Sequence, residues 1–191
     1  MVQKILDTAS GQVSMDLRYA TGEAEVYQAQ YLDTKTWPDG YKRYADLFRH
    51  DPKSLIVAVN NQGAVMSHMG VERIHDYEIG PDMPGWDHDP KVVFRPDGNV
   101  WYIVGHVVGP EYRKSGLAYE VVGYTIEEAR ANPEIDMLAV ILRENHPTLG
   151  KASKFWEKFG LKPLEHTRNA GWKASPEAPD SGGIVYAIDT V

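Results

Sequence analysis

The chain has no cysteine among its 191 residues. This absence excludes disulfides, zinc–thiolate sites, iron–sulfur clusters and a cysteine nucleophile. The sequence also lacks any run of 18 consecutive apolar residues, and residues 1–7 contain no apolar signal-peptide core. We therefore predict a cytoplasmic protein without a transmembrane helix.

The chain has fewer positively charged than negatively charged residues. The chain carries 20 Lys and Arg residues against 27 Asp and Glu residues, a formal net charge of −7. A net anion is a poor non-specific partner for nucleic acid or for an acidic membrane, and it attracts cations such as amines. We therefore expect neither nucleic acid nor a membrane as a partner.

Apolar spacing predicts alternating strands and helices in one domain. Residues 54–59, 99–108 and 137–142 are apolar runs typical of buried strands, whereas residues 116–132 and 149–159 carry apolar side chains at helical spacing. This order predicts an α/β (α+β) fold with one mixed central sheet of six to seven strands, flanked by about four helices.

Two segments stand apart from this regular pattern. Residues 1–12 are weakly patterned, so we expect an N-terminal arm before a domain that spans residues 13–191. Residues 75–98 are rich in Pro, Gly and acidic side chains, which predicts an acidic loop insertion in that domain. This loop is interpreted either as an acidic lip over a cationic ligand or as a solvated surface loop.

The segment from Val107 to Ala118 carries the clearest chemical pattern. An apolar strand enters a short turn that leads directly into a helix. Gly116 allows close approach of a ligand, and the first N–H groups of the helix favour an anion. Arg113 and Lys114 add positive charge, so the pattern predicts a phosphate or pyrophosphate site. A Walker loop would need Gly in place of Lys114, and no GxGxxG follows a strand.

The pattern Arg-x-x-Gly-x-Ala at 113–118 resembles the acetyl-CoA loop of the GNAT acetyltransferases, whose signature is Gln/Arg-x-x-Gly-x-Gly/Ala. Lys114 departs from it, since many members have Gly there. A second block, from Asn145 through Ala152 to Phe155-Trp156-Glu157-Lys158-Phe159-Gly160-Leu161, and the segment Arg18–Glu23 also resemble this family. The resemblance covers residues 13–190.

The resemblance implies the GNAT fold and an N-acetyltransferase. Such an enzyme transfers an acetyl group from acetyl-CoA to a primary amine of a small molecule or peptide by direct attack in a ternary complex. A cationic amine is one candidate acceptor, and a homodimer is common in the family. The implied acyl-CoA contacts are the backbone of Val107 and Val108 for pantetheine, the loop residues Arg113, Lys114, Ser115, Gly116, Leu117 and Ala118 for pyrophosphate, and Asn145.

A base or a water chain must deprotonate the amine before it attacks. His106 lies on the predicted central strand, Tyr102 shares its face by two-residue alternation, and Glu72 lies on the neighbouring strand. These three are the catalytic candidates, although His106 and Glu72 are also compatible with a core role.

Trp156 stands where many family members have a Tyr that reprotonates the CoA thiolate. An indole N–H cannot release its proton near neutral pH, so Trp156 is no general acid, and packing explains it. Asp87-His88-Asp89 lacks a second ligand pair, so we predict no metal. Two alternatives stay open: a longer acyl donor, and an acyl-CoA-binding sensor or interaction module without turnover.

Overall fold

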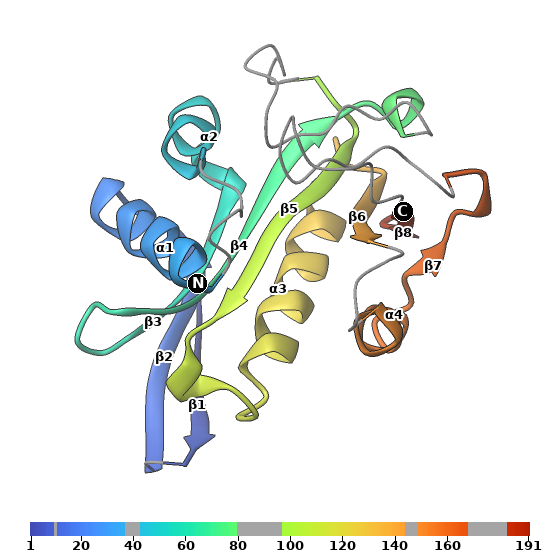
Figure 1. Cartoon of the computed structure of the whole chain (residues 1–191). Coiled ribbons are helices and arrows are strands. Elements are labelled where there is room, and N and C mark those ends of the chain that lie inside the picture. Colours follow the sequence, from blue (N-terminus) through green and yellow to red (C-terminus); the bar gives the residue numbers. More distant parts are fainter. Residues whose placement is uncertain (10, 37–42, 80–96, 144–148, 168–182) are drawn as a thin grey trace. The chain divides into compact units, whose positions relative to one another are not determined.

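A computed structural model describes residues 1–9, 11–36, 43–79, 97–143, 149–167 and 183–191. Its strands are β1 (Val2–Thr8), β2 (Gly11–Tyr19), β3 (Leu55–Asn60), β4 (Val65–Ile74), β5 (Val100–Val108), β6 (Met137–Arg143), β7 (Lys162–Pro163) and β8 (Gly183–Asp189). Its α-helices are α1 (Glu23–Thr36), α2 (Tyr44–His50), α3 (Leu117–Ala131) and α4 (Leu149–Glu157) (Figure 1).

The strands form one mixed sheet in the order β1-β2-β3-β4-β5-β6-β8-β7. The β1–β2, β2–β3 and β3–β4 pairs are antiparallel, and β5 and β6 are parallel. The predicted α+β class, mixed sheet and four helices are confirmed for the part of the chain that the structure describes. The sheet has eight strands rather than six or seven, and β1 accounts for the extra strand.

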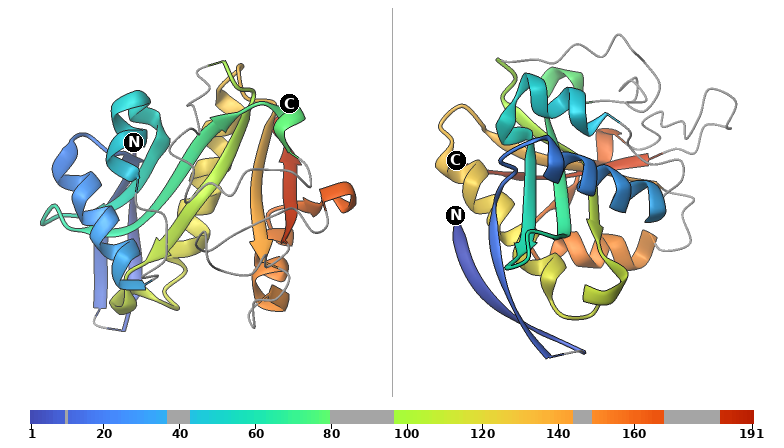
Figure 2. Two further views of the ribbon diagram at one scale, coloured as in Figure 1. Left: turned by 45° about the horizontal axis from the view of Figure 1, so that its top comes forward. Right: turned by 90° about the vertical axis from the view of Figure 1, so that its left-hand side faces the viewer.

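The first residues differ from the expected arm. Strand β1 pairs antiparallel with β2 along its whole length, from Val2 opposite Leu17 to Thr8 opposite Gly11. Figure 2 shows the two as a long hairpin. Leu6 is the one buried residue of β1. An edge strand that buries a single side chain has almost no alternation of apolar and polar residues, so its sequence does not reveal it.

The described residues pack as two compact units. Unit 1 contains Met1–Val71 and Val104–Glu127, and unit 2 contains Glu72–Ile103 and Glu128–Val191. Strands β4 and β5 therefore contribute residues to both units.

In unit 1, α1 and α2 cover one face of β3. Val26 and Ala29 of α1 and Tyr44 and Leu47 of α2 pack with apolar residues of β3 in one buried cluster. The start of α1 is fixed by Glu25, whose carboxylate accepts two hydrogen bonds from Arg18, at 2.9 and 2.7 Å, and one from the backbone N–H of Thr21 at 2.8 Å. These bonds hold the pKa of Glu25 below its ordinary value, chiefly through Arg18.

In unit 2, β6 is the central strand. Its residues Met137–Val140 pair in parallel with Val100–Ile103 of β5, and the whole of β6 pairs antiparallel with β8. The described ends of the 75–98 insertion include a short 3-10 turn at Asp76–Glu78. Residues 80–96, which carry most of the predicted acidic loop, lie outside the described residues.

Candidate functional site

The turn between β5 and α3 lies entirely in unit 1. A 3-10 turn at Pro110–Tyr112 leads to Lys114, which has a φ of 67°, and to Gly116, which has a φ of 89°. The Ser115 hydroxyl donates to the carbonyl of Tyr112 at 2.5 Å. Left-handed residues in a turn are typical of the backbone nests that bind anions.

Several backbone N–H groups of this turn are available to a ligand. Within the described residues, the N–H groups of Lys114, Gly116 and Ala118 meet no acceptor of the chain, and Leu117 has only a 3.4 Å contact to the Ser115 hydroxyl. They stand at the N-terminus of a 15-residue helix, where the dipole favours negative charge. The side chains of Arg113 and Lys114 are exposed beside them. The turn therefore has the chemistry of a phosphate site.

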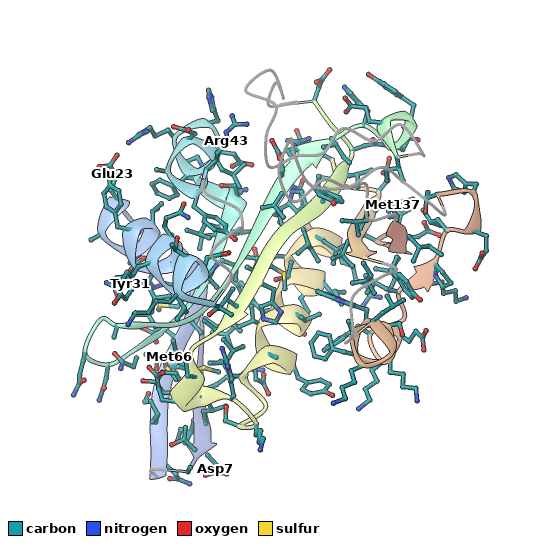
Figure 3. All side chains as sticks on the ribbon, in the orientation of Figure 1. Asp7, Glu23, Tyr31, Arg43, Met66 and Met137 are labelled. Atoms are coloured by element: carbon teal, nitrogen blue, oxygen red, sulfur yellow. The ribbon has the colours of Figure 1, made fainter. Side chains whose placement is uncertain are left out.

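The turn is tied to β4, also within unit 1. The Gly109 N–H donates to the carbonyl of Met66 at 2.9 Å, and the Ser67 hydroxyl donates to the carbonyl of Val107 at 2.7 Å. Figure 3 shows Met66 beside the turn. The end of β5 at Val108 and the loop predicted to bind pyrophosphate are thus held in one place. Asn145 lies outside the described residues.

His106 lies on β5, two residues before Val108, and its Nε2 atom is buried. Burial and the neighbouring His68 lower the pKa of His106 to about 3. The imidazole is therefore neutral at neutral pH. A neutral imidazole can accept a proton, but this low pKa makes it a weaker base than an ordinary histidine.

The other two catalytic candidates belong to unit 2. Glu72 on β4 and Tyr102 on β5 are both buried, with exposed fractions of 5% and 2%. His106 belongs to unit 1. The roles of all three stay predictions.

Trp156 lies on α4 with 6% of its surface exposed, and its ring contacts Phe155 edge to face at 5.2 Å. This position supports the packing interpretation of Trp156. In the described parts of the chain, no three His, Asp or Glu side chains gather where they could hold a metal ion. No helix in those parts is long and apolar enough to cross a membrane.

Sequence reasoning did not find a further group of side chains in unit 1. Asp33 of α1, Tyr44 of α2 and His68 of β4 are buried together. Two glycines inside strands, Gly70 and Gly105, were the available signal, because a glycine within a strand often marks close approach of another group.

The sequence pattern of the Acetyltransferase (GNAT) family matches residues 23–161, well over half of the chain. The chain belongs to the GNAT acetyltransferase family. The predicted fold and family are therefore confirmed, and the matched range contains the β5–α3 turn and α4. No curated protein sequence matches the chain.

Solved structures resemble the fold at low sequence identity. The GphF GNAT-like decarboxylase in complex with isobutyryl-CoA is 16% identical, with 92% of this chain and 100% of that chain covered and a TM-score of 0.72. The loading GNATL domain of CurA from Lyngbya majuscula is 14% identical, with 92% and 98% covered and a TM-score of 0.75. The ribosomal-protein-S18-alanine N-acetyltransferase from Escherichia coli is 10% identical, with 92% and 94% covered and a TM-score of 0.60. At these identities the likeness concerns the fold alone.

Proposed function

We propose that this GNAT-family chain binds acyl-CoA at the β5–α3 turn and transfers an acetyl group from acetyl-CoA to a primary amine. The observation that carries the proposal is the set of three backbone N–H groups, at Lys114, Gly116 and Ala118, that have no acceptor among the described residues. They lie at the start of α3 beside the exposed side chains of Arg113 and Lys114, and N–H groups at a helix N-terminus suit a phosphate. An acyl-CoA complex of the same fold supports this choice of ligand.

In the proposed reaction the neutral amine attacks the thioester carbonyl directly. The C–N bond forms, the C–S bond breaks, and CoA leaves as thiolate. His106 or a water chain takes the proton from the amine. Trp156 gives no proton to the thiolate, so we propose that the thiolate leaves without an acid from that position. Cytoplasmic location, a cationic acceptor and a homodimer stay predictions.

The binding test uses two glycines with the same backbone conformation. Gly116 and Gly63 have φ values of 89° and 80°, and a Cβ at either would meet no atom within 4 Å. Gly116→Val and Gly63→Val therefore carry similar backbone strain, but only the first places a side chain among the proposed phosphate-binding amides. We expect Gly116→Val to weaken acetyl-CoA binding at least tenfold in a calorimetric titration and Gly63→Val to leave it within twofold. Equal affinities in the two variants would refute the site.

A second candidate keeps the acyl-CoA site and replaces amine transfer by decarboxylation of a carboxyacyl-CoA. Two observations favour it: the decarboxylase and loading-domain structures have TM-scores of 0.72 and 0.75, and Trp156 replaces the usual acid. Mass spectrometry after incubation with malonyl-CoA, or with acetyl-CoA and a panel of amines, separates the two. Acetyl-CoA formed from malonyl-CoA would support the decarboxylase, and an N-acetyl amine would support the transferase. Acyl-CoA binding without either product would support the sensor interpretation.

A further inference from the structure

Strand β4 carries one extra residue beside the β5–α3 turn, within unit 1. Ala58 of β3 pairs with Ser67, but the next residue of β3, Val59, pairs with Val65, so Met66 has no opposite residue on β3. Such a β-bulge bends its strand and redirects the groups next to it. From this bulge, Met66 and Ser67 both contact the end of β5 (Figure 3).

Two hydrogen bonds connect the bulge to alternate residues at the end of β5. The Gly109 N–H donates to the Met66 carbonyl at 2.9 Å, and the Ser67 hydroxyl donates to the Val107 carbonyl at 2.7 Å. Ser67 has no exposed surface, so water does not compete for its bond. The approach at Gly109 is close, because a Cβ there would lie 3.1 Å from the Met66 carbonyl. The backbone from 107 to 109 is thus held against β4 at both of its ends.

These two bonds determine which way Val108 faces. In an extended strand, the backbone groups of successive residues point to opposite edges. The Val107 carbonyl and the Gly109 N–H both point to β4, so the N–H and C=O of Val108 point to the other edge. In the described part of the chain, the pairing of β5 with β6 covers Val100–Ile103 and ends before Val108. The Val108 carbonyl meets Nε of Arg113 at 3.4 Å, which is longer than an ordinary hydrogen bond and can give way to a donor of a ligand.

We propose that Ser67 is a positioning residue for acyl-CoA, because its hydroxyl holds the Val107 carbonyl to β4 and so turns Val108 toward the ligand. The pantetheine arm of CoA contains amide groups, which can exchange hydrogen bonds with the N–H and C=O of Val108 as a neighbouring strand would. Val107 then makes no direct contact, in contrast to the expectation that both valines bind pantetheine. The orientation of Val108 follows from the contacts above, whereas its ligand rests on the proposed function.

Two buried serines of unit 1 provide a matched pair of variants. Ser67→Ala removes the hydroxyl that bonds to Val107. Ser54→Ala removes a hydroxyl that is equally buried but has no hydrogen-bond partner among the described residues. Each substitution takes one oxygen atom from the interior. A difference between the two variants therefore reports the Ser67–Val107 bond rather than the loss of a buried hydroxyl.

Calorimetric titration separates the pantetheine arm from the pyrophosphate. The two ligands are acetyl-CoA and adenosine 3′-phosphate 5′-diphosphate, which carries the pyrophosphate but no pantetheine. We expect Ser67→Ala to weaken acetyl-CoA binding roughly fivefold, the factor for about one hydrogen bond, and to leave the nucleotide within about twofold. Ser54→Ala should leave both affinities within about twofold. A Ser67→Ala variant that keeps both affinities, or loses both equally, would overturn the positioning role.

Amide exchange of the two valines, followed by NMR in the wild-type chain, tests the orientation of Val108. Acetyl-CoA should slow the exchange of the Val108 N–H by about tenfold, because a pantetheine carbonyl then accepts from it. The Val107 N–H points to β4 and should change by no more than about twofold. If Val108 gains no more protection than Val107, the assignment of Val108 to the ligand is wrong.

The Ser67–Val107 bond can also be tested without any ligand. In the free chain, Ser67→Ala should raise the exchange rate of the Gly109 N–H roughly fivefold, because only one bond then holds the end of β5, and Ser54→Ala should leave that rate unchanged. A wild-type chain that binds no CoA but shows this difference would refute the proposed function and leave the Ser67–Val107 bond in place. An unchanged Gly109 rate in a chain that binds acetyl-CoA would overturn the role of Ser67 alone.

Discussion

Lys114 adopts the left-handed conformation with a φ of 67°, at the position where many GNAT loops have Gly. An L-residue in this region carries a cost of roughly 1–2 kcal/mol that Gly avoids. We therefore expect Lys114→Gly to be more stable than Lys114→Ala by about 1 kcal/mol, as measured by urea unfolding. Both variants remove the charge of Lys114, so the difference between their stabilities reports the conformational cost of the left-handed backbone.

The same pair of substitutions at Lys154 is the control. Lys154 is exposed in the middle of α4, where Gly is less favourable than Ala by about 1 kcal/mol. The order of Gly and Ala should therefore reverse between the two positions. If Ala is the more stable residue at position 114 as well, the left-handed turn does not persist in solution.

Gly105 lies so close to the buried Asp33–Tyr44 hydrogen bond that only a residue without a side chain fits there. A Cβ there would lie 2.0 Å from the Tyr44 hydroxyl, so Gly105→Ala must displace Tyr44 and break its buried bond to Asp33. We expect a loss of about 2–4 kcal/mol in the free energy of unfolding, from overpacking and a lost buried hydrogen bond.

Gly123→Ala provides the contrast to Gly105→Ala. Gly123 lies within α3, and a Cβ there meets no atom within 4 Å. The extra methyl should stabilise the helix by roughly 0.5–1 kcal/mol. Equal effects of the two substitutions in chemical denaturation would contradict the packing around Tyr44.

At the scale of single residues, the sequence reveals the phosphate-binding pattern of the β5–α3 turn. It does not reveal the contact between the buried residues Asp33 and His68. Arg113, Lys114 and Gly116 are adjacent in sequence, so their pattern could be recognised directly. Asp33 and His68 are 35 positions apart on a helix and a strand, and no motif connects them. Only tertiary packing brings such groups together, so no sequence pattern connects Asp33 with His68.

At the scale of elements, the start of α1 depends on one carboxylate. Glu25 accepts hydrogen bonds from Arg18 and from the backbone of Thr21, and its side chain is 14% exposed. We expect Glu25→Gln to cost about 2 kcal/mol at pH 7, the range for hydrogen bonds to a partly buried charged group.

The pH dependence of this loss has a clear sign. The folded-state pKa of Glu25 lies below its unfolded value, so its contribution is present above about pH 4.3 and disappears as the pH falls through the folded-state pKa. The difference between wild type and Glu25→Gln should therefore shrink in unfolding experiments between pH 5 and pH 2. Glu23→Gln removes an exposed contact with Arg49 at 3.3 Å and should change stability by less than about 0.5 kcal/mol throughout.

The strands and the helix that pack on the core are the elements that the sequence predicts best. The apolar runs that became β3, β5 and β6 and the helical stripe of α3 are visible in the sequence because packing on a core imposes a period on it. Strand β1 lies at the end of the sheet and buries only Leu6, so its sequence carries almost no such period. For this reason the weak pattern of residues 1–12 predicts an arm, although residues 2–8 form a strand.

At the scale of the whole molecule, an anionic protein is proposed to bind an anionic ligand. With a net charge of −7, the chain as a whole repels CoA, so affinity must come from the local N–H groups and cations of the β5–α3 turn. A ligand that binds only the folded state at 100 times its Kd stabilises that state by about 2.7 kcal/mol. For a chain of this size, that corresponds to a rise in Tm of roughly 5–10 °C.

Hydrogen exchange with and without acetyl-CoA locates the origin of this stabilisation. The N–H groups of Lys114, Gly116 and Ala118 have no acceptor among the described residues, so they should exchange rapidly in the free protein and at least tenfold more slowly once phosphate oxygens accept from them. A peptide covering residues 109–120 should therefore gain protection, whereas the β1–β2 hairpin of the same unit should change little. A rise in Tm with no protection at 109–120 would mean that CoA stabilises the chain from another site, and the turn would lose its proposed role.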